Sequence, residues 1–223
     1  MAFKELFPLV TVDVALFSVE ERNLQVLLVQ RGQAPQQSQW ALPGGILRPD
    51  GDKDLADTAR RVLREKVDVD IPHLEQLHAF SGATRDPRGW SISVLFAALL
   101  PRQDIPAVVR SRVEAVRWAG AGTPQKLAFD HAQQLDAALA WLRARVDRHS
   151  LPLHLMPPLF TLTELQHTCE AILDRPLDKS VFRRRLKGSL DLEEVDDYVR
   201  GAQRPAQLYR ARKGFSFSAQ GVF

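Results

Sequence analysis

Two arginines flank an aspartate in the short polar segment Arg85-Asp86-Pro87-Arg88, which joins two predicted strands. The planar guanidinium group of arginine can hold a phosphate through two hydrogen bonds at once. The segment is therefore a candidate anion-binding loop. Taken alone, it is more often an ordinary solvated hairpin loop, so its neighbours in the fold must decide between the two interpretations.

A second cationic group falls within one short predicted helix and consists of Lys179, Arg183, Arg184, Arg185 and Lys187. Asp178 alone opposes these five charges locally, and their excess is larger than the net charge of +3 of the whole chain. Residues four apart share a helix face, so Phe182 and Leu186 can pack inward while the cations enter a DNA major groove. A helix of this composition is more commonly a solvated surface.

The elements that position these groups follow from hydrophobic periodicity. Apolar runs of strand length are predicted as strands, at residues 10–16, 24–29, 74–80, 91–100 and 113–118. Helical spacing predicts helices over 54–67, capped by Asp54, and over 131–148. Residues 32–39 and 43–45 carry glycine and proline and predict breaks in regular structure. The N-terminal part therefore combines a sheet with helices.

Three prolines within residues 150–158 predict that the preceding helix stops there. We place a first domain at 1–149, a packed linker at 150–159 and a second domain at 160–223.

The second domain begins with predicted helices over 161–173 and 178–186, for which Thr161 or Thr163 and Asp178 are candidate caps. A hairpin follows, with strands at 188–194 and 206–212 joined by a loop over 196–205. Helix, turn, helix and hairpin is the order of a winged helix.

Bulk composition narrows the class of protein. The 223 residues are 45% hydrophobic and 26% charged, which is typical of globular domains. The single cysteine, Cys169, excludes a disulfide framework and a cysteine-rich zinc site, and it suggests a reducing compartment. The chain starts without a signal-peptide pattern, and the apolar run at 92–100 is too short to span a bilayer. We expect a soluble cytoplasmic protein with no membrane partner.

The sequences WALPGG at residues 40–45 and RVLREKVDV at 61–69 together resemble a Nudix box. That family's pattern is G-x5-E-x7-R-E-U-x-E-E-x-G-U, where U is bulky and aliphatic. Its glutamates hold magnesium around a diphosphate. Aligned on Arg61, the glutamates of the pattern fall on Lys53, Val62, Glu65 and Lys66, so that only Glu65 is retained.

Valine offers magnesium no ligand and lysine repels the ion, because magnesium requires oxygen ligands. The resemblance therefore implies a degenerate Nudix domain with no catalytic residues and no metal site. The loop before the helix is also two residues longer than the pattern. Glu65 can equally serve a structural role, because it lies four residues after Arg61 and can form a surface ion pair with it.

Over residues 9–212 the chain resembles the Nudix-related transcriptional regulators of NAD metabolism, the NrtR-like family. The resemblance rests on the arginine segment, on LAFDH at 127–131 and on FTLTELQ at 160–166. It implies an α+β fold: an N-terminal Nudix-type α/β/α sandwich with a mixed sheet, followed by a C-terminal winged helix-turn-helix domain. In that family the Nudix domain senses ADP-ribose or a related nucleotide, the winged helix binds operator DNA, and the protein is a homodimer.

Carried over to this sequence, the resemblance implies an effector site formed by Trp40, Gly44, Gly45, Arg48, Glu65, Arg85, Arg88 and His131. A histidine at a helix start is often only a local hydrogen-bonding residue, which is the alternative for His131. The implied DNA-binding residues are the five cations of the basic helix together with Arg204 and Arg210 in the wing.

The leading hypothesis is a repressor of genes for NAD biosynthesis or salvage, which binds double-stranded operator DNA as a dimer and is released by an ADP-ribose-like nucleotide. It needs no cofactor. One alternative is an active Nudix hydrolase of ADP-ribose with an accessory DNA-binding domain, which Val62 and Lys66 oppose. The other is a winged helix that binds a protein partner, which the basic helix opposes.

Overall fold

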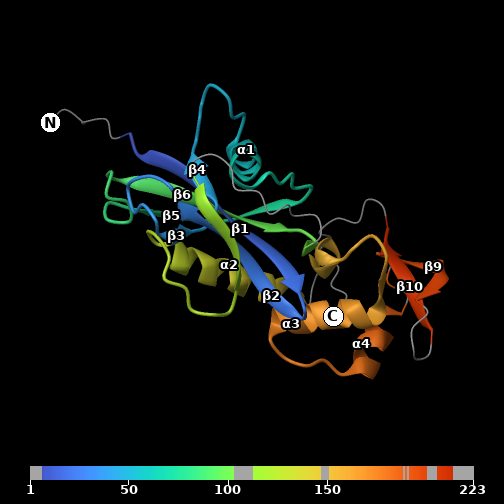
Figure 1. The fold of residues 1–223 in the computed structure, drawn as a ribbon. Helices are drawn as coiled ribbons and strands as arrows, with labels where there is room; N and C mark the ends of the chain where they lie inside the picture. The colour runs from blue at the N-terminus through green and yellow to red at the C-terminus, as the bar shows by residue number, and fades with distance from the viewer. Residues whose placement is uncertain are drawn as a thin grey trace. The chain divides into compact units, whose positions relative to one another are not determined.

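A computed structural model of the chain describes residues 7–102, 113–146, 151–187, 189, 191–199 and 205–212 (Figure 1). The chain folds into two compact units. The first takes its described residues from 1–17, 26–99 and 105–139, and the second takes them from 18–25, 100–104 and 140–223.

A mixed sheet forms the centre of the first unit, with strand order β3-β2-β1-β6-β5, while β4 pairs with β1 and β7 with β2. The strands are β1 (Leu9–Glu20), β2 (Asn23–Arg31), β3 (Trp40–Ala41), β4 (Gly44–Ile46), β5 (Leu74–Gly82), β6 (Ser91–Leu99) and β7 (Val113–Gly120). β1 and β6 run parallel, and both are buried over most of their length. Their largely apolar sequences suit strands covered on both faces. The pairs β1–β4, β2–β3 and β5–β6 are antiparallel, so the predicted mixed sheet is confirmed.

Helix α1 (Leu55–Val67) has the predicted N-cap, since the side chain of Asp54 accepts a hydrogen bond from the backbone N–H of Asp57. Its buried face includes Val62 and Leu63, as the periodicity predicted. Helix α2 (His131–Val146) begins where expected. The predicted end of α2 at residue 148 lies outside the described residues. Among the residues that the structure describes, no helix is both long and apolar enough to cross a bilayer.

The glycine pair at positions 44 and 45 does not break regular structure, and in this respect the sequence-based prediction was wrong. Gly44 pairs with Asp13 and Gly45 with Val12 in a short antiparallel ladder between β4 and β1. A Cβ on Gly44 would collide with the carboxylate of Asp13, and one on Gly45 would lie 2.7 Å from a methyl group of Val62. Only residues without a side chain let β4 approach β1 and α1 this closely.

The second unit contains the helix-turn-helix and the hairpin of the predicted winged helix. Its elements are the 3₁₀ helix η2 (Leu151–Leu155), β8 (Phe160–Thr161), α3 (Leu162–Leu173), α4 (Lys179–Leu186), β9 (Leu192–Val199) and β10 (Ala206–Ala211). A reciprocal capping box between Thr161 and Glu164 starts α3, and Asp178 caps α4. The proline-containing segment at η2 is largely buried.

The first wing strand differs from the prediction. β9 includes residues 196–199, which were expected to be loop, and it begins at Leu192 rather than at residue 188. Val199 and Tyr198 pair with Ala206 and Gln207 of β10. An edge strand with a solvated face accommodates the charged side chains of this segment, so the strand continues further than predicted.

The close approach of β4 to β1 predicts that Gly44→Ala lowers the free energy of unfolding by roughly 1–3 kcal/mol, as overpacking does. Gly51→Ala is the matched control, because a Cβ at Gly51 meets nothing within 4 Å. Urea denaturation of both variants measures the difference. A Gly44→Ala protein as stable as Gly51→Ala would contradict this account of β4.

Candidate functional site

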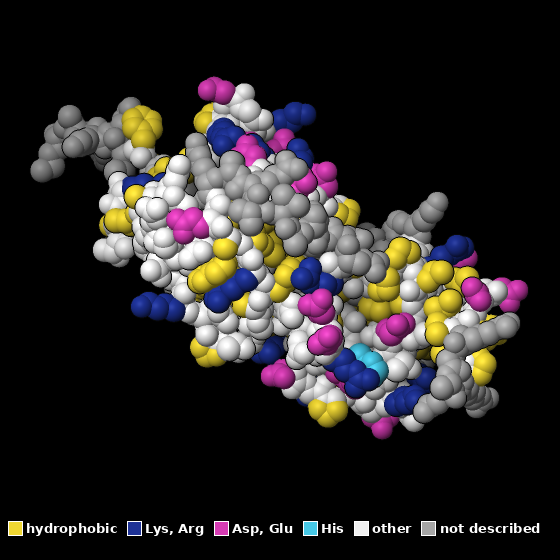
Figure 2. Space-filling view, in the orientation of Figure 1, with side chains coloured by type: hydrophobic (Ala, Val, Ile, Leu, Met, Phe, Trp, Pro, Cys, Tyr) yellow, Lys and Arg dark blue, Asp and Glu magenta, His cyan; other side chains and the backbone are white. Residues whose placement is uncertain are grey.

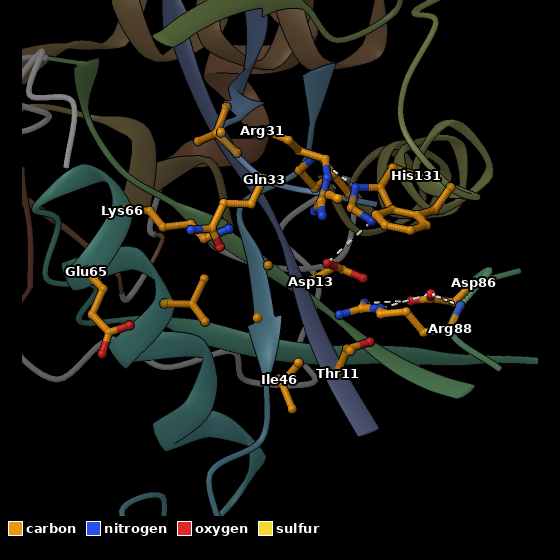
Figure 3. A pocket seen from close by; sticks show the side chains of 18 of the residues that line it. Thr11, Asp13, Arg31, Gln33, Ile46, Glu65, Lys66, Asp86, Arg88 and His131 are labelled. Carbon is orange, nitrogen blue, oxygen red and sulfur yellow. Dashed lines mark hydrogen bonds and ion pairs between the residues drawn. The ribbon is translucent and has the colours of Figure 1, made fainter. Parts of the chain in front are cut away.

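A cavity of about 530 Å³ opens in the first unit, where β1, β4, the N-terminus of α2 and the face of α1 converge (Figure 3). Seven of the eight predicted effector residues line it: Gly44, Gly45, Arg48, Glu65, Arg85, Arg88 and His131. Trp40 is not among the lining residues. Its ring instead packs under the guanidinium of Arg117, 4.2 Å from the ring centre.

Arg85 and Arg88 are each held by a carboxylate. The guanidinium of Arg85 donates two hydrogen bonds to Asp130, of 2.8 and 2.7 Å, and its side chain is only 8% exposed. This pair ties the β5–β6 loop to the start of α2. Arg88 donates two hydrogen bonds to Asp86. Although burial raises the pKa of Asp86, these bonds hold it below its ordinary value.

A second ionic network lines the opposite side of the cavity. Arg61 donates to both oxygens of the buried Asp52 at 2.7 Å. Arg61 also lies 3.4 Å from Glu65, whose carboxylate accepts hydrogen bonds of 2.6 and 3.1 Å from Arg48. The hydrogen bonds from Arg61 hold the pKa of Asp52 well below its usual range, against the opposing effect of burial. Glu65 thus does form the ion pair with Arg61 that the spacing predicted.

His131 belongs to a buried network behind the cavity. Its Nδ1 accepts the backbone N–H of Leu42 at 3.0 Å, and its Nε2 lies 3.5 Å from Asp13. Burial lowers the pKa of His131, which favours a neutral ring with its proton on Nε2, facing the carboxylate. Asp13 also accepts hydrogen bonds from Ser93 and from Gln134. Both ring nitrogens of His131 are therefore used within the fold.

Sequence reasoning missed several lining residues: Asp13, Arg31, Arg61, Lys66 and Phe129. Asp13 had a signal, because it is the only charged residue in the apolar run at residues 10–16, which lies within β1. The guanidinium of Arg31 lies 4.8 Å from the ring centre of Phe129. That contact joins segments almost a hundred residues apart, so no local sequence pattern predicts it.

The basic helix α4 presents a cationic surface. Lys179, Arg183, Arg184, Arg185 and Lys187 are all exposed, whereas Phe182 and Leu186 are buried as predicted. In the part of the chain that the structure describes, none of the five is in an ion pair. Figure 2 shows basic side chains on the surface over α3 and α4, with acidic side chains among them. Arg185 also lines a second cavity, of about 350 Å³, beside the α3–α4 turn.

Only one of the two predicted DNA-binding residues of the wing lies within the described residues. Arg204 lies outside the described residues. Arg210 lies in β10, where its guanidinium donates hydrogen bonds of 3.0 and 2.8 Å to Glu193 of the neighbouring strand β9. Its charge is already balanced across the hairpin, in contrast to the cations of α4.

Comparison with known proteins identifies both units. Residues 8–142 match the NUDIX domain family, and residues 152–211 match the NrtR DNA-binding winged helix domain. The fold and the cleft thus define a Nudix-type domain joined to a DNA-binding winged helix.

The chain is 46% identical over 205 residues to the ADPR responsive transcriptional repressor NtrR of Acinetobacter baylyi, a match that covers 91% of this chain and 82% of the relative. It is 27% identical over 129 residues to an ADP-ribose pyrophosphatase of Methanocaldococcus jannaschii, covering 57% of this chain and 73% of that protein. The chain belongs to the NrtR family.

Two solved structures extend the comparison. Shewanella oneidensis NrtR complexed with a 27mer DNA is 35% identical, with a TM-score of 0.83 over 91% of this chain and 93% of that one. The NUDIX domain of the same NrtR complexed with ADP ribose is 37% identical, with a TM-score of 0.58 over 62% of this chain and 90% of that one.

The residues of this cleft do not fit the magnesium that Nudix hydrolases use. Magnesium requires an octahedral set of oxygen ligands. The helix face offers the hydrocarbon of Val62 and the ammonium of Lys66, and Arg48 and Arg61 engage the carboxylate of Glu65. Within the described residues, no group of three or more acidic, histidine or cysteine side chains is placed to hold a metal.

The depressed pKa of Asp52 predicts a pH-dependent contribution to stability. Because its folded-state pKa lies below the unfolded value of about 3.9, the ionised carboxylate stabilises the fold above that pH, and the stabilisation is lost as the pH falls towards the folded-state pKa. Asp52→Asn should therefore cost roughly 1.5–3 kcal/mol at neutral pH, with a smaller difference from wild type below about pH 4.

Urea denaturation at both pH values measures this effect, with Asp50→Asn as the control, because Asp50 is exposed in the same loop. A cost for Asp52→Asn that is the same at neutral and acidic pH would show that ionisation of Asp52 is not the source of its stabilising effect.

Proposed function

We propose that the chain is a cytoplasmic, homodimeric repressor of genes for NAD biosynthesis or salvage, which binds operator DNA and is released by an ADP-ribose-like nucleotide. The observation that carries the proposal is the exposed cationic face of α4 in a winged helix domain of the NrtR type. We also propose that a linker at 150–159 separates an effector-binding domain (1–149) from a DNA-binding domain (160–223).

The second helix of a helix-turn-helix lies in the major groove in complexes of this class. In this chain that helix is α4, which Asp178 caps and which Phe182 and Leu186 anchor to the core. None of its cations forms an ion pair within the described residues, so DNA phosphates can supply the counter-charge. The DNA complex of the Shewanella protein supports this assignment.

The cleft of the first unit suits a nucleotide with a diphosphate. Six of the described residues that line it are Lys or Arg and three are Asp or Glu. Its volume of about 530 Å³ is in the usual range for small-molecule sites. The ADP-ribose complex of the Shewanella NUDIX domain supports an ADP-ribose-like effector.

We propose that this effector is bound and not hydrolysed. Nudix hydrolysis depends on carboxylates that hold magnesium, and the helix face of this chain carries Val62 and Lys66 at two of those positions. The similarity to an ADP-ribose pyrophosphatase is consistent with a cleft that binds ADP-ribose but does not hydrolyse it.

Release of DNA requires that the nucleotide bind the DNA-free state more tightly than the DNA-bound state. A tenfold preference corresponds to about 1.4 kcal/mol of coupling. The two-fold symmetry of a homodimer matches an inverted-repeat operator, with one winged helix on each half-site.

A gel shift on the chain's own upstream DNA tests the DNA-binding part of the proposal. We expect a specific shift that unlabelled competitor DNA of unrelated sequence does not remove. Arg183→Ala should weaken specific binding about tenfold or more, because it removes an exposed cation of α4 without breaking a described ion pair.

Arg60→Ala is the control, with the same loss of charge on α1. If wild type gave no specific shift, the repressor proposal would fail. Equal affinities of the Arg183→Ala and Arg60→Ala variants would remove α4 from the DNA interface.

The effector part is tested with Ile46→Asp. Ile46 lines the cleft and is 44% exposed, so the substitution places a negative charge opposite the diphosphate with little loss of packing. We expect operator binding to persist while ADP-ribose no longer releases the DNA. Ile46→Thr, which adds no charge, should still respond. An Ile46→Asp variant that ADP-ribose releases as readily as wild type would contradict this placement of the effector.

A further inference from the structure

Lys66 occupies the place on α1 where the Nudix pattern has its last metal-binding glutamate. It lines the cavity together with Val62 and Glu65. Figure 3 shows its side chain extending towards Gln33, in the segment that follows β2. A positive group therefore replaces a negative one on the helix face that lines the effector cleft.

The carboxylates of the cleft are already engaged by the protein's own groups. Glu65 binds Arg48 and Arg61, and Asp86 binds Arg88. Asp13 accepts hydrogen bonds from Ser93 and Gln134. A divalent metal would have to displace these partners, and the ammonium of Lys66 would repel it.

A bound diphosphate still needs positive charge close to it. In Nudix hydrolases the bound metal supplies much of this positive charge. In this cleft the described lining cations are five arginines and Lys66. Lys66 differs from these arginines in kind, because its ammonium is a compact point charge on a flexible stem, which is the closest protein equivalent of a bound cation.

We infer that Lys66 takes the place of magnesium in this cleft: its ammonium group contacts the diphosphate of the effector, and the nucleotide binds without a divalent metal. This inference rests on the proposed function. It also explains why a sensor can keep its ligand intact, since without a metal no water is activated to attack the diphosphate.

Isothermal titration calorimetry of the full chain with ADP-ribose tests the inference, once with EDTA and once with magnesium. We expect wild type to bind with the same affinity in both buffers. Lys66→Met keeps the length of the side chain and removes the charge, and it should weaken binding about tenfold or more in both. Lys66→Arg keeps the charge and should bind within a few-fold of wild type.

Lys53→Met is the matched control, because Lys53 is exposed in the loop before α1 and does not line the cleft. It should bind ADP-ribose as wild type does. Operator binding without nucleotide should be unchanged in all the variants, which shows that they are folded.

The outcomes separate this inference from the function on which it rests. Binding by wild type only in magnesium, or equal affinities of Lys66→Met and Lys53→Met, would overturn the role of Lys66 and leave ADP-ribose sensing in place. If wild type bound ADP-ribose in neither buffer, the effector assignment itself would be wrong.

Discussion

The first unit depends on one buried carboxylate, that of Asp13 in the central strand β1, whose residue is only 5% exposed. A carboxyl group in such a place is stable only when hydrogen bonds replace its lost water. Ser93 of β6 and Gln134 of α2 supply them, and Nε2 of His131 lies 3.5 Å away. The same carboxylate leaves no room for a Cβ on Gly44 of β4. Asp13 thus joins two strands and a helix to β1 and sets the back wall of the cleft.

Elsewhere around the cleft, arginines rather than neutral hydrogen-bond donors hold the acidic side chains. In a Nudix hydrolase a metal ion organises the acidic side chains, whereas in this chain guanidinium groups do so. Asp52 and Glu65 are joined through Arg61, and Arg48 closes the network. Arg85 and Asp130 form an equivalent pair on the other side. These ion pairs hold the lining side chains in place before any ligand enters, which lowers the cost of ordering them on binding.

The second unit carries exposed cations on α4 and an ion pair across its hairpin. The cations of α4 stand exposed on a helix that two apolar side chains hold to the core. The hairpin carries acidic residues in β9, and Glu193 there neutralises Arg210 of β10. Exposed cations that form no ion pair within the described residues attract a polyanion, which favours α4 over Arg210 as a contact.

Local pattern was enough to predict much of this protein. The cap and apolar face of α1, the two helices of the winged helix and the central apolar strands all follow from periodicity and capping, which act over a few residues. The absence of the Nudix carboxylates at Val62 and Lys66 can also be read directly from the order of residues. Only the tertiary structure decided that Gly44 and Gly45 form a strand and that Arg85 pairs with Asp130, 45 positions away. It likewise decided that Asp13, Arg31 and Lys66 line one cleft. These contacts join segments far apart in the chain, and their partners are set by packing, which no local pattern encodes.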